Sequence, residues 1–317
     1  MDYILKTERL RTYFDVPAGF LHAVDDVSLQ IRRGTTMGIV GESGCGKSTL
    51  GRTILHLTPI TAGKVIYNDR DISQLNKREV KELRQEMQMI FQDPYSSLDP
   101  RMNITRIIEE PLKIYKKCGS KAERQELVKN LMELVGLAPR FAMSYPHELD
   151  GGRRQRIGIA RALALEPKFI VCDEPVSALD VSIQAQILNL LKDIQEKNGL
   201  TYMFITHDLS VVRHISDEIC VMYLGRVVEQ CEAKELFRHP LHPYTMALLA
   251  AIPSPNLAKR RELELIRGEV SSPVNPKPCC RFVSRCPYAE ERCQAEDPAL
   301  LDVGNGHKCA CFKVQGM

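Results

Sequence analysis

A glycine-rich segment between residues 41 and 49 constrains the fold of this chain more than any other feature. It reads Gly41-Glu42-Ser43-Gly44-Cys45-Gly46-Lys47-Ser48-Thr49 and fits the pattern G-x-x-x-x-G-K-[ST]. An apolar run, TTMGIV, precedes it, and a helical pattern over residues 48–56 follows it. In this strand–loop–helix context, glycines let backbone N–H groups converge on an anion at the start of a helix. We therefore predict a nucleotide site in which Lys47 reaches the β- and γ-phosphates and Ser48 coordinates Mg²⁺.

The rest of the chain predicts an α/β fold of about two domains. Apolar runs typical of buried strands occur at residues 169–173, 201–208 and 218–223, and residues 2–40 contain further strand patterns. Helical patterns alternate with these runs, which favours a largely parallel sheet. We expect a nucleotide-binding domain at residues 1–240, interrupted by a helical subdomain at about 93–165. Regular patterning fades after Pro240, so we expect a separate C-terminal extension at 241–317, with a cysteine-rich module at about 279–311.

Two adjacent carboxylates lie at the end of an apolar run: Asp173 is the last residue of FIVCD, and Glu174 follows it. Asp173 lies at the end of the predicted strand, where it can hold Mg²⁺ directly or through water. Glu174 then faces the attacking water as a general base. Charged residues at the end of a strand are common, but beside a phosphate-binding loop they indicate a catalytic site.

Three further features follow in a fixed order along the chain. Gln92 comes after the strand pattern MQMIF, where a neutral amide can bind Mg²⁺ or orient water. Asp150, Gly151 and Gly152 precede the apolar helix IGIARALAL, whose start is a second potential anion site. His207 ends the strand pattern TYMFITHD, where an imidazole can contact a γ-phosphate. Taken singly, these features are also consistent with a turn residue, a simple helix start and a structural histidine.

Bulk properties exclude several other classes of protein. The 43 basic and 40 acidic residues give a net charge of +3, which is too balanced to indicate a nucleic-acid partner. No run approaches the ~18 apolar residues of a transmembrane helix. The first ten residues, MDYILKTERL, carry charges where a secretory signal has an apolar run. We expect a cytosolic chain with no direct membrane insertion.

These motifs, in this order, resemble those of the ATP-binding cassette (ABC) ATPases over residues 4–240. GESGCGKST resembles the Walker A loop, QDP at 92–94 the Q-loop, and LDGGRRQ at 149–155 the signature motif. VCDEP resembles Walker B, SALD ending at Asp180 resembles the D-loop, and His207 resembles the switch histidine. The resemblance implies an ABC-type P-loop NTPase fold with an antiparallel β subdomain and a helical insert.

The same resemblance implies how ATP is held. Two such domains pair head to tail, and each ATP lies between the Walker A loop of one domain and the signature of the other. Phe14 lies where the family places an aromatic residue that stacks on adenine. Tyr13 is an alternative for this role, and either ring is also consistent with a core aromatic residue.

Three longer segments resemble the oligopeptide/dipeptide/nickel importer subfamily, and within it the F-type ATPase subunit. They are MIFQDPYSSLDPRM, CDEPVSALDVSIQAQILNLL and HPLHPYTMALLAAIPSP. The resemblance implies an ATPase that drives uptake of oligopeptides or dipeptides, with nickel or another small solute as the alternative. It also implies a sister ABC ATPase as heterodimer partner, two transmembrane permease subunits and an extracytoplasmic substrate-binding protein. The chain would then lie on the cytoplasmic face of the cell membrane as a peripheral subunit.

Position 150 departs from the family pattern, which usually has a serine whose hydroxyl contacts the γ-phosphate bound by the partner. A carboxylate beside a triphosphate costs electrostatic energy unless a cation or a proton intervenes. Arg153 and Arg154 offer such cations, although the family often has glutamine at position 153. Asp150 is therefore either a tolerated variant, which we favour because both glycines remain, or the mark of a transporter with one slow ATP site.

Six of the eleven cysteines lie between residues 279 and 311. Cys280, Cys286, Cys293 and Cys311 match the tail of this subfamily, where four thiolates resemble the ligands of a [4Fe–4S] cluster. Four thiolates from one short segment suit such a cluster or tetrahedral Zn²⁺, and their spacing lacks the C-x₂-C pairs of zinc ribbons. We favour the cluster over zinc. Cys279 or Cys309 could replace a neighbour as ligand, and free structural thiols are a third interpretation.

A function outside transport stays open because of Asp150. A regulatory nucleotide-binding protein without turnover would tolerate a changed signature. The complete set of Lys47, Asp173, Glu174 and His207 favours ATP hydrolysis instead. A single cassette argues against translation factors, which usually carry two, and the insert is too short for the coiled coil of DNA-repair cassettes.

Overall fold

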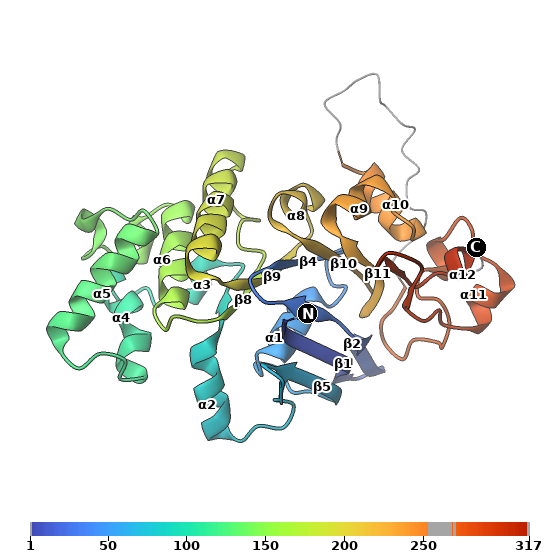
Figure 1. Cartoon of the computed structure of the whole chain (residues 1–317), viewed down its shortest axis with the longest axis horizontal. Helices are drawn as coiled ribbons and strands as arrows, with labels where there is room; N and C mark the ends of the chain where they lie inside the picture. Colours follow the sequence, from blue (N-terminus) through green and yellow to red (C-terminus); the bar gives the residue numbers. More distant parts are fainter. Residues whose placement is uncertain (1, 253–267, 269–270, 316–317) are drawn as a thin grey trace. The chain divides into compact units, whose positions relative to one another are not determined.

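The computed structural model describes residues 2–252, 268 and 271–315 (Figure 1). It divides into two compact units, the first unit (Met1–Gln74 and Phe204–Met317) and the second unit (Leu75–Met203). The glycine-rich loop and the C-terminal extension belong to the first unit, and the helical insert belongs to the second. Strand β9 (Thr201–Thr206) carries the chain back into the first unit. Both ends of the sequence therefore belong to the same unit.

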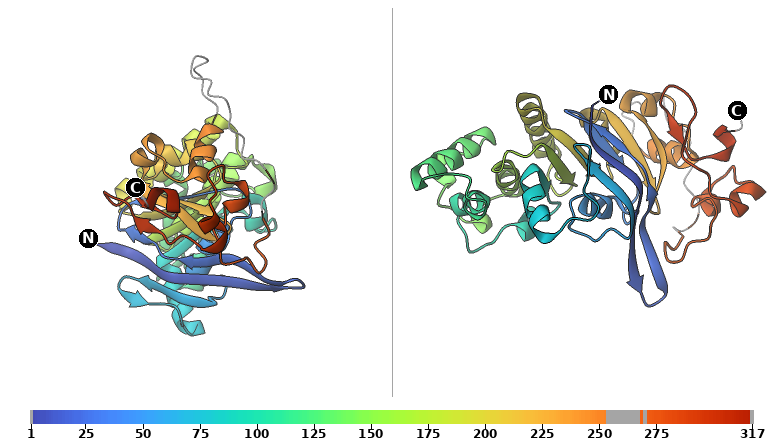
Figure 2. Two further views of the ribbon diagram at one scale, coloured as in Figure 1. Left: turned by 90° about the vertical axis from the view of Figure 1, so that its right-hand side faces the viewer. Right: turned by 60° about the horizontal axis from the view of Figure 1, so that its bottom comes forward.

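An antiparallel sheet forms the N-terminal part of the first unit. It consists of β1 (Tyr3–Val16), β2 (Gly19–Val27), β3 (Gln30–Arg32), β5 (Ala62–Tyr67) and β6 (Arg70–Asp71). The order is β2-β1-β5-β6, and β3 pairs with β1. Figure 2 shows β1 and β2 as a long hairpin. A register irregularity next to Thr12 places Tyr13 opposite His22 and Phe14 opposite Leu21.

A mixed sheet forms the other layer of the first unit. The strands of this sheet that lie wholly within the first unit are β4 (Thr36–Val40), β10 (Glu218–Tyr223), β11 (Arg226–Glu232), β12 (Leu301–Asp302) and β13 (Lys308–Cys309), and β9 also belongs to it. Strand β4 runs parallel to β10, and β11 pairs antiparallel with both β10 and β13. All five residues of β4 are buried, as expected for a strand covered on both faces. The first-unit helices α1 (Lys47–Ile54), α8 (Leu209–Ile215), α9 (Ala233–Arg238) and α10 (Pro243–Ala250) follow strands of these sheets or one another.

The described part of the C-terminal extension shares a hydrophobic core with β10 and β11. Its short elements are α10, η4 (Val283–Arg285), α11 (Glu291–Ala295), β12, β13 and α12 (Phe312–Gln315). Tyr244 and Phe282, both from the extension, are buried beside Tyr223 of β10, with ring centroids 4.7–5.5 Å apart. Aromatic rings at these separations and tilts attract one another in addition to burying apolar area. The two sides of the predicted boundary near residue 240 are thus joined by one core.

The second unit is mostly helical. Its elements are α2 (Lys77–Glu86), β7 (Met87–Ile90), α3 (Pro94–Ser97), α4 (Ile104–Ile114), α5 (Lys121–Leu134), η1 (Pro139–Phe141), η2 (Pro146–Glu148), α6 (Gly151–Leu163), β8 (Phe169–Asp173) and α7 (Val181–Asn198). Strands β7 and β8 pair in parallel, and α6 contacts α3, α4 and α5. Side chains cap several helix starts, as Asn103 does for α4 and Ser120 for α5. Among the residues described, no helix combines the length and the hydropathy needed to cross a membrane.

The structure corrects two details of the sequence-based expectation. The sheet that contains β4 and β10 is mixed rather than largely parallel. After β10 the chain turns at Leu224 and Gly225 and returns antiparallel as β11. Helix α2 was not expected. Only Val80 and Leu83 of its residues are apolar and none of its residues is buried, so the segment resembles a polar stretch in the sequence. The helix begins with a capping box between Asn76 and Glu79.

Candidate nucleotide-binding and catalytic site

The glycine-rich loop connects β4 to α1, as the sequence predicts, and it needs glycine at two closely packed positions. Gly41 has φ +152°, and a Cβ added there would lie 2.2 Å from the carbonyl oxygen of Met222. Gly46 has φ +103°, and its added Cβ would lie 1.9 Å from the carbonyl oxygen of Ala23. Any side chain at either position would clash with backbone, so the loop can follow this path only with glycines. Between them, Ser43 and Gly44 are exposed.

Lys47 lies under the loop at the start of α1. Its side chain is buried, and its Nζ donates hydrogen bonds to the carbonyl oxygens of Gly41 at 2.8 Å and Glu42 at 2.9 Å. Ser48 and Thr49 are half-buried in the first turn of the same helix. A cation inside a glycine loop at a helix N-terminus is the arrangement that attracts a polyphosphate.

Cys45 is buried beneath this loop. Its Sγ lies 3.8 Å from Lys47 Nζ, and its carbonyl oxygen accepts a hydrogen bond from Gly225 N–H at 2.9 Å. Burial raises the pKa of the Cys45 thiol, although the charge of Lys47 opposes the shift. The thiol is therefore neutral at physiological pH and packs against the loop.

The two aromatic candidates for adenine stacking have different surroundings. Phe14 is 38% exposed on β1, whereas the ring of Tyr13 stacks on His22 with a centroid separation of 3.8 Å. The Tyr13 hydroxyl donates a 2.5 Å hydrogen bond to Asp25, and burial together with this bond raises the pKa of Tyr13 to about 12. The exposed ring of Phe14 is thus available to a ligand, while Tyr13 is held by its neighbours.

In the second unit, two predicted catalytic residues are in direct contact. Asp173 ends the buried strand β8, and Glu174 follows it with φ +46°. Gln92, in the loop after β7, donates a hydrogen bond from Nε2 to Glu174 Oε2 at 2.9 Å. Because β7 and β8 are parallel neighbours, their carboxyl ends bring these three side chains to one edge.

The signature segment begins α6, and Asp150 caps this helix. Its Oδ1 accepts a hydrogen bond from Arg153 N–H at 2.8 Å, and its Oδ2 forms an ion pair with the Arg153 guanidinium. Arg153 therefore offsets the charge of Asp150, as the sequence suggested. Arg154 does not, since it donates to the carbonyl oxygen of Pro146 at 2.7 Å and lies over the ring of Tyr95.

The two glycines of the signature pack against the segment that contains the predicted D-loop. A Cβ added at Gly151 would lie 3.1 Å from Leu179, and one at Gly152 would lie 2.7 Å from Ile183. Asp180 occupies the N-cap position of α7 with an exposed side chain. The signature and the D-loop are thus neighbours within the second unit.

His207 lies in the first unit, exposed between β9 and α8. The next residue, Asp208, caps α8 by accepting a hydrogen bond from Ser210 N–H at 2.7 Å. The predicted site residues are therefore distributed over both units. Phe14, the glycine loop and His207 belong to the first, and the Q-loop, signature, Walker B and D-loop residues belong to the second.

Four cysteines of the C-terminal extension line one small cavity. Cys280, Cys286, Cys293 and Cys311 surround a space of about 20 Å³ together with aromatic side chains. Burial raises the pKa of the Cys280 thiol to about 12, and the other three sulfurs add to this shift. Among the described residues, no group of three or more Cys, His, Asp or Glu side chains lies close enough together to hold a metal ion. Cys309 is buried on β13, opposite Glu229 of β11.

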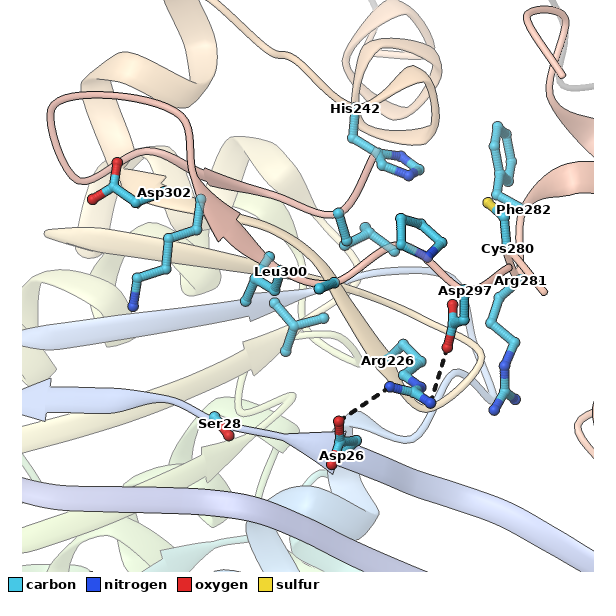
Figure 3. A pocket seen from close by; sticks show the side chains of 16 residues that line it. Asp26, Ser28, Arg226, His242, Cys280, Arg281, Phe282, Asp297, Leu300 and Asp302 are labelled. Carbon is cyan, nitrogen blue, oxygen red and sulfur yellow. Dashed lines mark hydrogen bonds and ion pairs between the residues drawn. The ribbon is translucent and has the colours of Figure 1, made fainter. Parts of the chain in front are cut away.

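A larger cavity of about 320 Å³ shares Cys280 with this one (Figure 3). Arg226 of β11 lies between Asp26 and Asp297, at 3.4 Å and 2.9 Å. Burial raises the pKa of Asp297 above its usual value, although the positive charge of Arg226 partly opposes this shift. Arg281 forms a further ion pair with the buried Asp25. These paired charges join the extension to β2 and β11.

Two residues without a recognisable motif, Tyr244 and Arg285, contact the glycine loop. Tyr244 Oη accepts a hydrogen bond from Glu42 N–H at 2.8 Å. The guanidinium of Arg285 forms a two-bond ion pair with the Glu42 carboxylate. Both residues are about 200 or more positions away in sequence, and no local pattern indicates the contact.

Comparison with known proteins places the chain in a family. The family described as ABC transporter matches residues 24–177, and the one described as oligopeptide/dipeptide transporter, C-terminal region, matches residues 228–293. The chain is 50% identical to the probable peptide ABC transporter ATP-binding protein y4tS of Sinorhizobium fredii over 98% of this chain and 90% of the relative. It is 51% identical to the putative oligopeptide transport ATP-binding protein YkfD of Bacillus subtilis, over 97% and 94%. It is also 51% identical to the oligopeptide transport ATP-binding protein OppF of Haemophilus influenzae, over 93% and 89%.

Solved structures agree with these relatives. The ATP-binding cassette MJ0796, solved as a dimer in a post-hydrolysis state with ADP and phosphate, is 31% identical with a TM-score of 0.67, over 72% of this chain and 98% of that one. CbiO1 of Clostridium perfringens, part of an ABC transporter complex, is 29% identical with a TM-score of 0.67, over 75% and 92%. The antiparallel sheet, the mixed sheet, the glycine loop and the full-length relatives together show that this chain belongs to the ATP-binding proteins of ABC transporters, a family of ATPases.

Proposed function

We propose that this chain is the ATP-hydrolysing subunit of an importer for oligopeptides or dipeptides. One observation carries the proposal: relatives named for peptide transport are about 50% identical over nearly the whole chain, including the C-terminal extension. A nickel or other small-solute importer is the alternative within the same subfamily. Substrate choice depends on permease and binding-protein subunits, so the cassette alone does not set it.

We assign the nucleotide-site roles residue by residue. Lys47 holds the β- and γ-phosphates, which it reaches by exchanging its two carbonyl partners for phosphate oxygens. Ser48 and Asp173 would hold Mg²⁺, which would offset the negative charge of the phosphates. The donor set fits this ion, since hydroxyl and carboxylate oxygens are the ligands that Mg²⁺ prefers. Phe14 stacks on the adenine.

Glu174 is the general base, and Gln92 is its partner. The hydrogen bond between them holds the carboxylate in one orientation before ATP binds. Glu174 then takes a proton from the attacking water, and Gln92 is free to bind Mg²⁺ or orient that water. His207 contacts the γ-phosphate from the end of β9. Asp150, Gly151 and Gly152, with Asp180, act on the ATP bound by the partner domain.

The proposed assembly rests on the relatives named for peptide transport. Residues 1–240 form the ATPase domain, the helical subdomain at about 93–165 docks on the permease subunits, and residues 241–317 form the extension. A sister ATPase supplies the second half of each ATP site as a heterodimer partner. The complex further contains two permeases and an extracytoplasmic binding protein, with this chain on the cytoplasmic face of the membrane.

Purification of the tagged chain from native membranes tests the assembly. We expect two permeases and a second ABC ATPase to co-purify, and reconstituted vesicles to couple ATP hydrolysis to peptide uptake. Glu174→Gln should retain ATP binding and abolish both activities, because only the general base is lost. Recovery of the chain alone, or of a complex that transports a metal ion and no peptide, would contradict the peptide assignment.

We further propose that Cys280, Cys286, Cys293 and Cys311 hold a [4Fe–4S] cluster, with Zn²⁺ as the alternative. The four cysteines line one cavity, and thiolate-only donor sets suit both groups. Their side chains do not lie close enough together here to hold a metal ion, so binding would require the sulfurs to move toward one another. Cys309 is less suited as a substitute ligand because it is buried on β13 beside Glu229. A bound cluster or zinc ion would link four positions of the C-terminal extension to one another and would therefore have a structural role.

Anaerobic purification with iron, sulfide and zinc analysis tests this proposal. About four iron and four sulfide per chain, with loss of both in Cys286→Ser, would support the cluster. Cys118→Ser is a matched control, since Cys118 is a half-buried thiol of the second unit. One zinc per chain without iron would establish the alternative. The absence of both metals would show that the four cysteines are free thiols.

A further inference from the structure

Glu42, the second residue of the glycine loop, is held at three points. Its backbone N–H donates to Tyr244 Oη at 2.8 Å, and its carbonyl oxygen accepts from Lys47 Nζ at 2.9 Å. Its carboxylate accepts two hydrogen bonds from Arg285, from Nη1 at 2.8 Å and from Nη2 at 3.0 Å. Two of these three partners come from the C-terminal extension.

The contact from Arg285 is strong by its geometry. Two parallel N–H···O bonds between a guanidinium and a carboxylate are charge-assisted and fix the orientation of both groups. The side chain of Arg285 is only 7% exposed, so water competes little for the bonds. Its Nη1 also donates to Tyr223 Oη at 3.3 Å, which ties the guanidinium to the end of β10.

The extension presents Arg285 from a rigid support. Arg285 ends η4, three residues after Phe282, whose buried ring packs against Tyr223 and Tyr244. Tyr244 itself holds the backbone of Glu42, so the same aromatic cluster supports both contacts with the loop. A packed cluster of this kind transmits small displacements instead of absorbing them.

The charge of Glu42 makes this contact relevant to nucleotide binding. The loop that it belongs to receives a triphosphate, and an unpaired carboxylate there would repel that anion. The carboxylate also neighbours the two carbonyl groups that Lys47 must release. Arg285 neutralises the carboxylate and fixes the loop around Lys47 before ATP arrives, which reduces the cost of ordering it on binding.

We propose that Arg285 is a positioning residue for the phosphate loop, through which the C-terminal extension sets the affinity of the first unit for ATP. This inference rests on the proposed assignment of Gly41–Thr49 as the ATP-binding loop, and it does not depend on which metal, if any, the cysteines hold. Arg285 touches no substrate, since it acts through Glu42.

The test measures the Kd for Mg-ATP and the unfolding temperature of the full-length chain as purified. Arg285→Gln should raise the Kd about tenfold, because it leaves the Glu42 charge unpaired in the loop. Arg285→Lys keeps the charge but not the paired hydrogen bonds, and it should raise the Kd by about threefold. Arg292→Gln is the matched control, since Arg292 is 60% exposed on α11 and interacts with Glu296 and the ring of Phe312 rather than with Glu42.

The double variant Glu42→Gln/Arg285→Gln separates positioning from general stability. If Arg285 acts through Glu42, removing the carboxylate should restore part of the affinity that Arg285→Gln loses, so that the two effects do not add. A purely structural role predicts additive losses, and that result would overturn the inference, as would an unchanged Kd in Arg285→Gln and Arg285→Lys. Lys47→Ala checks the assignment on which the inference rests: normal ATP binding in that variant would remove the loop assignment itself. Should Arg285→Gln not fold, Arg285→Lys with and without Glu42→Gln gives the same comparison.

Discussion

Two adjacent aromatic residues on β1, Tyr13 and Phe14, have different surroundings. Tyr13 and Phe14 point to opposite faces because side chains alternate along a strand. Tyr13 stacks on His22 and binds Asp25, whereas Phe14 remains partly exposed. The sequence alone left both residues as candidates for adenine stacking, since it does not say which face meets solvent.

We expect Phe14→Ala to weaken ATP binding with little loss of stability. Stacking of a base on an aromatic ring contributes about 1–3 kcal/mol, so the Kd should rise at least about fivefold. Titration with Mg-ATP, together with thermal unfolding, measures both quantities. An unchanged Kd would remove Phe14 from the adenine site.

We expect the opposite pattern for Tyr13→Phe, which keeps the ring and removes the hydroxyl. Burial raises the pKa of Asp25, but the hydrogen bond from Tyr13 and the charge of Arg226 outweigh it, so the pKa is lowered below the usual 3.8. A carboxyl whose pKa is lowered in the folded state stabilises the fold above its unfolded pKa. That contribution is lost as the pH falls through the folded pKa.

Without the Tyr13 hydroxyl, the folded pKa of Asp25 moves up toward the unfolded value and its contribution shrinks. Acid unfolding should therefore begin at a higher pH, with about 1 kcal/mol less stability at neutral pH and an unchanged Kd for ATP. Circular dichroism across a series of pH values below 5 measures the shift. Identical acid transitions in both proteins would show that this hydrogen bond does not lower the pKa of Asp25.

At the scale of elements, helix α6 shows how an unusual residue can keep an ordinary role. Asp150 stands where the family usually has serine, and it caps the helix by the same kind of side-chain hydrogen bond that serine makes. Its negative charge also suits a helix N-terminus and is paired with Arg153. The geometry agrees with a tolerated substitution.

We expect Asp150→Ser to leave the ATPase rate of the assembled transporter within about twofold of the wild type, because the cap is preserved. Asp150→Ala removes the cap and should cost about 1 kcal/mol of stability. Steady-state hydrolysis and thermal unfolding provide the two readings. A large gain of turnover in Asp150→Ser would instead identify a site slowed by the carboxylate.

The sequence placed the glycine loop between a strand and a helix, as the structure does. It also singled out Gln92 and Glu174, which the structure joins by a hydrogen bond, because chemistry fixes both residue type and spacing at such positions; their catalytic roles stay predictions. Helix α2 was not predicted because none of its residues is buried. The antiparallel return of β11 was not predicted because strand direction depends on pairing, which no local pattern reveals. The contact of Arg285 with Glu42 joins positions far apart in sequence, and periodicity carries no information about such pairs.

At the scale of the molecule, the extension is part of the first unit's core rather than an appendage. Buried Glu229 of β11 accepts hydrogen bonds from the N–H groups of Leu241 and His242 and lies 2.7 Å from His307 Nε2. The two ends of the extension thus meet at one buried carboxylate. Such a network is costly to leave half satisfied, so both ends are needed for stability.

We expect a chain that ends at residue 240 to have a lower free energy of unfolding than the full-length chain. Removal of an independently folded domain would not lower it. The truncated chain would lose Tyr244 and Phe282 from the core and leave Glu229 without its partners. Phe282→Ala is the milder version and should cost about 3–5 kcal/mol. Denaturant unfolding measures both proteins. Equal stability of the truncated and full-length chains would show that the extension folds independently.

The pairing of the β1–β2 hairpin with the C-terminal extension has a consequence for synthesis. Asn275 accepts a hydrogen bond from Phe20 N–H at 3.0 Å and donates one to the carbonyl oxygen of Ala18, while His22 N–H donates to Pro273. On the ribosome, residues 75–203 emerge as one continuous stretch and can fold early. The β1–β2 hairpin is synthesised first, but its partners Pro273 and Asn275 are synthesised only after most of the chain. A polypeptide that stops before Tyr244 and Arg285 would lack both contacts with Glu42, and we expect it to bind ATP more weakly than the full-length chain.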